Sequence, residues 1–297
     1  MRRLRPCTGA ALDYALIALM AVSFSSASIF VLLSGLPGPS AATWRLVISS
    51  AVMWVLLLGR RAQDLNGLDG STLAATIASG ALLALHFDLW MSSLYIIPVG
   101  VSVAIVDSYP AFIWALGSAL FKERYTPLEL VGSALTVLGV VGLALAGGDP
   151  SSWLVGVLLS LGGMASMVGY VILGRWVRGK WSTTRYAALA YSFAAIVSLA
   201  VAALSGTLEF PVTPRQVGAV LGLVALPMFG GHTVMNYMLG RRKILPSTIA
   251  MSFEPAGASL LAFLVFGQRL TGYEWLMIAV TTLGIILCSI GLSKTYE

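Results

Sequence analysis

The stretch SYPAFIWALGSALFKERYT at residues 108–126 returns later in the chain as FEPAGASLLAFLVFGQRLT at residues 253–271. Both copies are apolar, with a proline near the start, an arginine near the end and a threonine at the end. Each matching pair is separated by the same 145 positions: Pro110 and Pro255, Phe121 and Phe266, Arg124 and Arg269, Thr126 and Thr271, Glu129 and Glu274, Gly139 and Gly284. The constant separation indicates a duplication, so we expect one structural unit to occur twice.

The composition is that of a membrane protein. Of 297 residues, 58% are hydrophobic and 10% are charged, whereas a soluble domain has about 25% charged residues. Mean hydropathy is +0.90. The net charge of +6 comes from basic residues in short loops, which is typical of cytoplasmic loops rather than of nucleic-acid binding. Cys7 and Cys288 do not form a disulfide framework.

About ten membrane spans are predicted, because a helix needs roughly 20 mostly apolar residues to cross a bilayer. The expected spans cover residues 12–33, 41–58, 73–95, 99–121, 128–146, 153–173, 184–204, 217–239, 245–266 and 273–292. Residues 1–147 would form a first five-helix repeat, residues 153–292 a second, and residues 293–297 a cytoplasmic tail. The N-terminal arginines resemble a signal peptide, but the apolar run after them is longer than a signal sequence, so we expect a retained helix.

Positive charge alternates between successive loops. One set of loops and termini is rich in basic residues: Arg2, Arg3, Arg5, Arg60, Arg61, Lys122, Arg124, Arg175, Arg178, Lys180, Arg185, Arg241, Arg242, Lys243 and Lys294. The alternate loops carry only Arg45, Arg215 and Arg269. This asymmetry predicts that both termini are cytoplasmic. Because each half has five spans, an odd number, the second half would cross the membrane in the opposite sense to the first.

The predicted fold is therefore an all-α polytopic membrane protein, with ten transmembrane helices arranged as two inverted five-helix repeats around a central cavity. Inverted repeats place a solute site near the bilayer midplane and allow it to open to either side in turn. An ionisable residue inside a span is costly and usually faces a cavity or a partner. For His86 and Asp107 we favour a cavity role, for Glu254 a structural role is slightly favoured, and for His232 the two are balanced.

Helical spacing groups some of these residues. Trp90 follows His86 by four positions, and Asn236 follows His232 by four, so each pair shares a helix face. The four residues are expected to form one pseudo-symmetric cavity wall. Asp88 is two residues after His86 and points to nearly the opposite side of the helix.

Further candidates come from prolines and aromatic rings. Pro110 and Pro255 are expected to kink their spans, because proline removes a backbone donor and clashes with the preceding turn. Rings that could face the cavity, with plain packing as the alternative for each, are Tyr109, Trp114, Tyr170 and Tyr191. No metal-ligand spacing or phosphate-binding loop occurs in the sequence, so no metal and no cofactor are expected.

The chain resembles the drug/metabolite transporter superfamily, in its ten-helix EamA-type branch. The resemblance rests on residues 98–142, with Tyr109-Pro110 and Glu123-Arg124, and on residues 245–287, with Glu254-Pro255. Segments 44–46 and 184–186, which carry Arg45 and Arg185, resemble the arginine-bearing second helix of each repeat. The resemblance implies a secondary carrier in a bacterial inner membrane. Gln268 departs from the glutamate usual in the family, which concerns a structural contact at a helix end.

Within the superfamily, the chain resembles the amino-acid exporters in His86, in Ile97-Pro98-Val99-Gly100 and in the aromatic residue before Pro110. We expect a non-enzymatic carrier that exports aromatic and other neutral amino acids by alternating access. It would need a small-molecule substrate and a lipid bilayer, with no nucleic acid and no obligatory protein partner.

Two alternatives to amino-acid export stay open. The first is export of other small metabolites or of cationic drugs, against which we weigh the lack of a clear carboxylate pair in the expected cavity. The second, more remote, is an intramembrane enzyme that uses His86 or His232 with Asp88 or Asp107.

Overall fold

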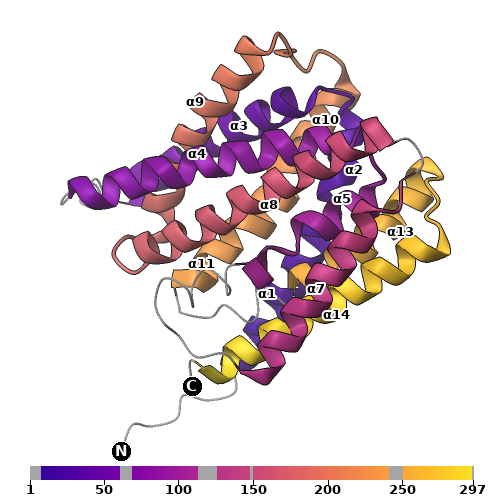
Figure 1. The fold of residues 1–297 in the computed structure, drawn as a ribbon. Helices are drawn as coiled ribbons and strands as arrows, with labels where there is room; N and C mark the ends of the chain where they lie inside the picture. The colour runs from indigo at the N-terminus through magenta and orange to yellow at the C-terminus, as the bar shows by residue number, and fades with distance from the viewer. Residues whose placement is uncertain (1–7, 61–68, 113–125, 148–149, 241–249, 296–297) are drawn as a thin grey trace, which may run out of the picture.

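A computed structural model shows a bundle of apolar helices (Figure 1) and describes residues 8–60, 69–112, 126–147, 150–240 and 250–295. In these ranges, eight helical spans are long and apolar enough to cross a membrane. Two shorter apolar helices, Val99–Phe112 and Ala250–Phe266, bring the number to the ten expected. The described residues contain no strand. The prediction of an all-α polytopic membrane protein with about ten helices is confirmed.

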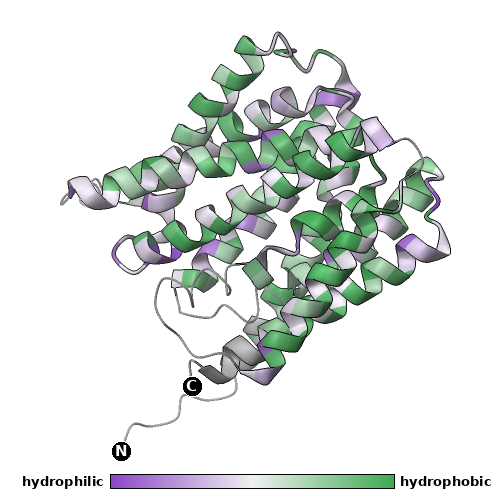
Figure 2. Cartoon of the chain, viewed as in Figure 1, coloured by the Kyte–Doolittle hydropathy of each residue, from purple (hydrophilic) through white to green (hydrophobic). Residues whose placement is uncertain are grey.

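The first half of the chain supplies five spans. The first span is divided into two helices, and its neighbours follow in order: α1 Thr8–Ser25, α2 Ala27–Ser34, α3 Gly38–Arg60, α4 Gly70–Ser93, α5 Val99–Val106 and α7 Pro127–Ala144. Hydrophobic residues run along the helices in Figure 2, and large apolar side chains such as Val55 and Leu138 are exposed. Such an exterior suits contact with lipid rather than water.

The second half supplies the other five spans, and its eighth span is interrupted by a π-helix, η2. The elements are α8 Pro150–Arg178, α9 Thr183–Leu204, α10 Pro214–Leu223, η2 Val224–Thr233, α11 Val234–Gly240, α13 Glu254–Phe266 and α14 Gly272–Thr295. Exchanging the halves preserves the main packing contacts. The third span, α4, packs on the sixth, α8, and in the same way the eighth span, α10 and η2, packs on the first, α2 and α1. The remaining spans pack on the matching span of the other half: α7 on α14, α3 on α9 and α5 on α13.

Glycines allow α7 and α14 to pack backbone against backbone. A Cβ atom on Gly132 would lie 2.7 Å from the carbonyl oxygen of Gly284, and one on Gly284 would lie 2.6 Å from the carbonyl oxygen of Gly132. Gly139 is equally tight, since its Cβ would lie 2.8 Å from the backbone nitrogen of Thr281. Small residues permit this close approach in membranes, where van der Waals packing drives helix association.

The same two helices begin with the same capping box. The backbone N–H of Thr126 donates to Glu129 Oε2 at 2.7 Å, and the N–H of Glu129 donates back to Thr126 Oγ1 at 3.3 Å. In α14, Thr271 N–H donates to Glu274 Oε2 at 2.6 Å, and Glu274 N–H donates to Thr271 Oγ1 at 3.2 Å. Each box satisfies two backbone donors that a helix N-terminus leaves free.

The structure corrects the placement of two arginines. Arg45 and Arg185 do not lie in loops: Arg45 is in the second turn of α3, and Arg185 is in the first turn of α9, and both are buried. They therefore do not contribute to the loop charges. Gln268, in contrast, keeps a structural contact, because its Oε1 accepts a hydrogen bond of 2.9 Å from Val99 N–H at the start of α5.

Candidate functional site

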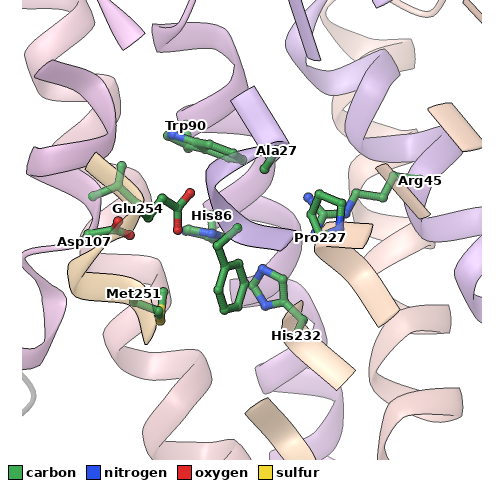
Figure 3. A pocket seen from close by; sticks show the side chains of 11 residues that line it. Ala27, Arg45, His86, Trp90, Asp107, Pro227, His232, Met251 and Glu254 are labelled. Atoms are coloured by element: carbon green, nitrogen blue, oxygen red, sulfur yellow. The ribbon is translucent and has the colours of Figure 1, made fainter. Parts of the chain in front are cut away.

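A central cavity lies where spans of the two halves meet (Figure 3). The ionisable residues that line it come from both halves: Arg45, His86, Asp107, His232 and Glu254. The cavity offers about 20 Å³ to the centre of a water-sized sphere, and one water molecule needs roughly 10–15 Å³ on this measure. The structure is thus a closed form in which the cavity has room for about one water molecule.

Interrupted helices converge on this cavity. The first span breaks at Ser26, between α1 and α2. In the fourth span a turn at Asp107 and Ser108 interrupts the regular α-helix, and in the ninth a turn at Phe253 does so directly before Glu254, while the backbone angles of Asp107 and Phe253 stay in the right-handed helical region. Irregular backbone at membrane depth is tolerated where it is buried in protein or lines a cavity. Residues that flank these breaks, including Asp107 and Glu254, line the cavity.

The breaks in the fourth and ninth spans lie just before the two prolines predicted to kink them. Asp107 and Ser108 precede Pro110, and Phe253 precedes Pro255, which lies in the first turn of α13. A proline cannot donate to the preceding turn, so both breaks have a local cause in the sequence. In the described residues, the regular helix of each of these two spans is thus interrupted just before the proline that was expected to kink it.

The eighth span is irregular because part of it is a π-helix. Residues Val224–Thr233 form a π-helix that contains Pro227 and ends just after His232. The side-chain hydroxyl of Thr233 donates to the Met228 carbonyl, five residues earlier, at 3.0 Å. The π-helix also packs closely on the first span, since a Cβ on Gly231 would lie 2.6 Å from the Phe24 ring. It places His232 on the cavity wall.

The two histidines lie close together in the cavity wall. The ring centroids of His86 and His232 are 6.1 Å apart, and the Trp90 ring lies nearly parallel to that of His86 with centroids 6.0 Å apart. His86 Nδ1 is 3.0 Å from the carbonyl oxygen of Gly163. Because a carbonyl can only accept, Nδ1 of His86 carries the hydrogen, and this bond fixes the ring between α4 and α8. The rings of Phe24 and His232 are nearly perpendicular, with 5.2 Å between their centroids.

Asp107 and Glu254 form a carboxyl pair, one member from each half. Both side chains are almost fully buried and line the cavity, where Figure 3 shows them next to each other. The expectation that the cavity lacks a clear carboxylate pair is therefore wrong. The repeat did not predict this pair, because Asp107 and Glu254 do not occupy equivalent positions in the two halves. Asp107 corresponds to Ser252, and Glu254 corresponds to Tyr109.

Arg45 was missed as a site residue. Its side chain has 0% exposure, and its Cζ lies 4.1 Å from the centroid of the Phe87 ring. None of its three side-chain nitrogens has a hydrogen-bond partner in the described part of the chain. Figure 3 shows Arg45 across the cavity from Asp107 and Glu254. The sequence did offer one indication of this role, because Arg45 falls inside the expected span at residues 41–58 and not in a loop.

The other predicted aromatic residues lie outside the cavity lining. Tyr109 is buried, and its hydroxyl donates to the sulfur of Met251 at 2.7 Å. Tyr170 and Tyr191 are fully buried, and the Asn236 side-chain amide donates to the Tyr170 hydroxyl at 2.7 Å. Tyr170 also contacts His232, with 6.2 Å between ring centroids. These residues therefore lie outside the lining, and Tyr170 packs against a residue that forms part of it. Trp114 lies outside the described residues.

Asp88 is separated from the cavity. Its Oδ1 accepts a hydrogen bond of 2.6 Å from the Ser198 hydroxyl of α9, and it is not part of the cavity lining. Asp88 and His86 therefore point to different sides of α4, and this agrees with the expectation from their two-residue spacing.

Several known proteins are similar to this chain. The uncharacterized transporter YwfM of Bacillus subtilis is 29% identical over 203 residues, which cover 65% of this chain and 64% of the relative. The probable terminal-alkyne amino-acid exporter of Streptantibioticus cattleyicolor is 26% identical over 176 residues, covering 58% of each chain. The uncharacterized inner membrane transporter YedA of Escherichia coli is 28% identical over 199 residues, covering 66% and 63%. The chain therefore spans less than two thirds of the length of these relatives.

A solved crystal structure of another protein has the same fold, with a TM-score of 0.70 and 17% identity over 97% of this chain and 99% of that chain. The model of the EamA-like transporter family matches the chain twice, at residues 12–145 and 154–290. Together these two segments take in nearly all of the spans. The chain belongs to the EamA-like transporter family, within the drug/metabolite transporter superfamily.

Proposed function

We propose that the protein exports amino acids, aromatic and other neutral ones, across the inner membrane by alternating access. One observation carries the proposal: the interrupted spans of both halves meet at one central cavity, and its wall combines ionisable groups with aromatic rings. Discontinuous helices in transporters form substrate sites at the interface of two repeats. Rings such as Trp90 and Phe24 suit an apolar or aromatic side chain. One relative is named a probable amino-acid exporter, which agrees with this substrate class.

The small size of the cavity and the duplication support alternating access. A cavity with room for about one water molecule can take up an amino acid only after the helices around it separate. We propose that residues 1–147 and 153–292 are two inverted five-helix repeats that move against each other, followed by a tail at residues 293–297. The packing contacts that are preserved when the halves are exchanged support this division.

The proposed orientation puts both termini in the cytoplasm. It relies on the basic residues in one set of loops, and it holds after Arg45 and Arg185 are removed from the count, because the change subtracts one arginine from each set. A relative named as an inner membrane transporter supports that membrane. The proposed carrier needs no cofactor, no nucleic acid and no obligatory protein partner.

Flux through the purified protein in liposomes tests the proposal. Radiolabelled phenylalanine should cross into or out of protein-containing vesicles, and unlabelled aromatic and neutral amino acids should compete with it. Vesicles that contain the heat-denatured protein give the background. Absence of flux for every amino acid of the panel would refute the substrate class.

A second substrate class is favoured by the Asp107–Glu254 pair. A buried acidic pair in a membrane cavity can hold a cation, so export of a lipophilic cation is the alternative. Tetraphenylphosphonium is a suitable probe in the same vesicles. Flux of this cation without competition from amino acids would select the alternative, whereas flux of phenylalanine that is insensitive to the cation would select the favoured proposal.

A further inference from the structure

The buried guanidinium of Arg45 is the group in the cavity whose hydrogen-bonding capacity is least used. It lies within α3, lines the cavity and is fully buried. Nε and both terminal nitrogens lack an acceptor among the described residues. A guanidinium carries five N–H donors in one plane and stays charged in proteins. A buried charge without a hydrogen-bonded partner is strongly unfavourable, so this group is poised for a partner that the ligand-free protein does not supply.

The surroundings of Arg45 leave its donors available to the cavity. Phe87 covers a face of the guanidinium, with 4.1 Å from Cζ to the ring centroid, and such stacking does not use the N–H groups at the edge of the plane. The acidic groups of the cavity, Asp107 and Glu254, lie together on its opposite side (Figure 3). Beside Arg45 the lining holds the apolar Pro227 (Figure 3).

We propose that Arg45 binds the carboxylate of the transported solute in the central cavity. This inference rests on the proposed transport function and names the group that the substrate must carry. A carboxylate matches the planar guanidinium with two parallel hydrogen bonds, which is the strong and directional form of this contact. It would also give the guanidinium a direct hydrogen-bond acceptor, which the described residues do not provide.

The opposite side of the cavity complements this arrangement. Asp107 Oδ2 is a buried acceptor without a hydrogen-bond partner in the described residues, and the carboxyl pair as a whole attracts a positive group. A neutral amino acid carries a carboxylate and an ammonium group at opposite ends of its polar head. The ammonium group would face Asp107 and Glu254 while the carboxylate faces Arg45. The site therefore favours zwitterions over plain amines.

The chain contains a matched control for Arg45. Arg185 occupies the corresponding helix of the second half, is also buried, and also stacks on an aromatic ring, with its Cζ 4.1 Å from the Trp181 centroid. It does not line the cavity. Replacing Arg185 therefore removes a buried, stacked arginine without touching the proposed carboxylate site.

Binding of three related probes to the purified full-length protein in nanodiscs tests the inference. The probes are phenylalanine, 3-phenylpropionate, which lacks the amine, and 2-phenylethylamine, which lacks the carboxylate. Dissociation constants are measured for the wild type and for Arg45→Gln, Arg45→Lys and Arg185→Gln. Arg45→Gln should bind phenylalanine and 3-phenylpropionate on the order of 10- to 100-fold more weakly, which is the range for a lost hydrogen bond to a charged group. Arg45→Lys should be intermediate, and Arg185→Gln should bind both carboxylates like the wild type.

Binding of 2-phenylethylamine separates this role from a general loss of structure. Its affinity for Arg45→Gln should not fall, because the amine makes no contact that needs Arg45. The melting temperature of each ligand-free variant is recorded, and Arg45→Lys serves as the readout if Arg45→Gln does not fold. Equal carboxylate affinities in the wild type and the Arg45 variants would overturn the inference, as would the absence of carboxylate binding to the wild type.

The result can be told apart from the fate of the transport proposal. If 3-phenylpropionate binds through Arg45 while no amino acid is transported, the carboxylate site stands and amino-acid export fails. If phenylalanine is transported equally well by the wild type and by Arg45→Gln, export stands and the carboxylate site fails.

Discussion

The same duplication has opposite outcomes in two regions of the molecule. One is the wall formed by α7 and α14, and the other is the central cavity. In the wall, equivalent positions hold the same residues: Thr126 and Thr271, Glu129 and Glu274, Gly139 and Gly284. In the cavity they differ, because Asp107 corresponds to Ser252 and Glu254 to Tyr109. Backbone contact between helices restricts both copies in the same way, whereas a solute with two different ends needs different groups on the two sides. The repeat is thus symmetric where it packs and asymmetric where it is proposed to bind.

The largest effect is expected from removing a charge on the asymmetric side. Asp107→Asn should lower the flux of phenylalanine in proteoliposomes by about 10- to 100-fold, the range for a lost hydrogen bond to a charged group. Asp88→Asn is the control, because Asp88 is a buried acid of the third span that lies outside the cavity and can still accept from Ser198 as an amide. Full flux through Asp107→Asn would remove the acidic pair from the proposed site.

A methyl group added to the symmetric wall should destabilise the protein rather than alter transport specificity. In Gly132→Ala the new Cβ would lie 2.6 Å from the backbone nitrogen of Cys288, and overpacking of this kind costs about 1–3 kcal/mol. The melting temperature in detergent should fall by several degrees. Gly218→Ala in α10 is the control, since nothing lies within 4 Å of its Cβ and alanine favours a helix by up to about 1 kcal/mol. An unchanged melting temperature for Gly132→Ala would contradict the close approach of α7 and α14.

The two capping boxes should contribute equally to the stability of the folded protein. Thr126→Ala and Thr271→Ala each remove a hydroxyl that accepts from the third backbone N–H of the helix, a change that costs about 1 kcal/mol. Thermal unfolding of the two variants should give similar shifts, and the corresponding Thr→Ser variants should remain close to the wild type. A clear difference between the two shifts would show that the symmetry of the wall is one of sequence and not of energy.

The smallest effect is expected at the histidine on the π-helix. His232→Ala removes one ring of the cavity wall, and a single aromatic contact is worth about 0.5–1.5 kcal/mol. The ratio of phenylalanine to alanine flux should therefore change by about 2- to 10-fold while transport persists. Loss of all transport would instead favour a chemical role for the histidine, as an intramembrane enzyme would require.

Hydropathy was sufficient to predict the spans, because a span depends on the average character of about 20 residues. The meeting of His86 and His232 was also predictable, since they occupy nearly equivalent positions in the third and eighth spans. The breaks at Asp107 and Phe253 follow from nearby prolines. In these cases the cause lies within one helix or in the relation between two repeats.

The remaining features of the site depend on contacts that no local pattern encodes. Arg45 was assigned to a loop because a charge near a span boundary usually lies outside the membrane. The π-helix at residues 224–233 has an internal proline and paired glycines, but such residues also occur in ordinary membrane helices. Asp107 and Glu254 meet at positions that the repeat does not relate. Such contacts become visible only when the two halves are packed together.

The buried guanidinium also affects how the chain enters its membrane. A charged residue inside a membrane helix raises the cost of insertion, by roughly 2.5–3.5 kcal/mol at the helix centre on translocon scales, so Arg45 disfavours the insertion of α3 alone. Glu254, an acidic residue on the opposite side of the cavity, belongs to the ninth span and is synthesised only after most of the chain has emerged. Nascent α3 therefore depends on neighbouring helices of its own half, and biogenesis of the carrier is completed late, when the C-terminal segments arrive.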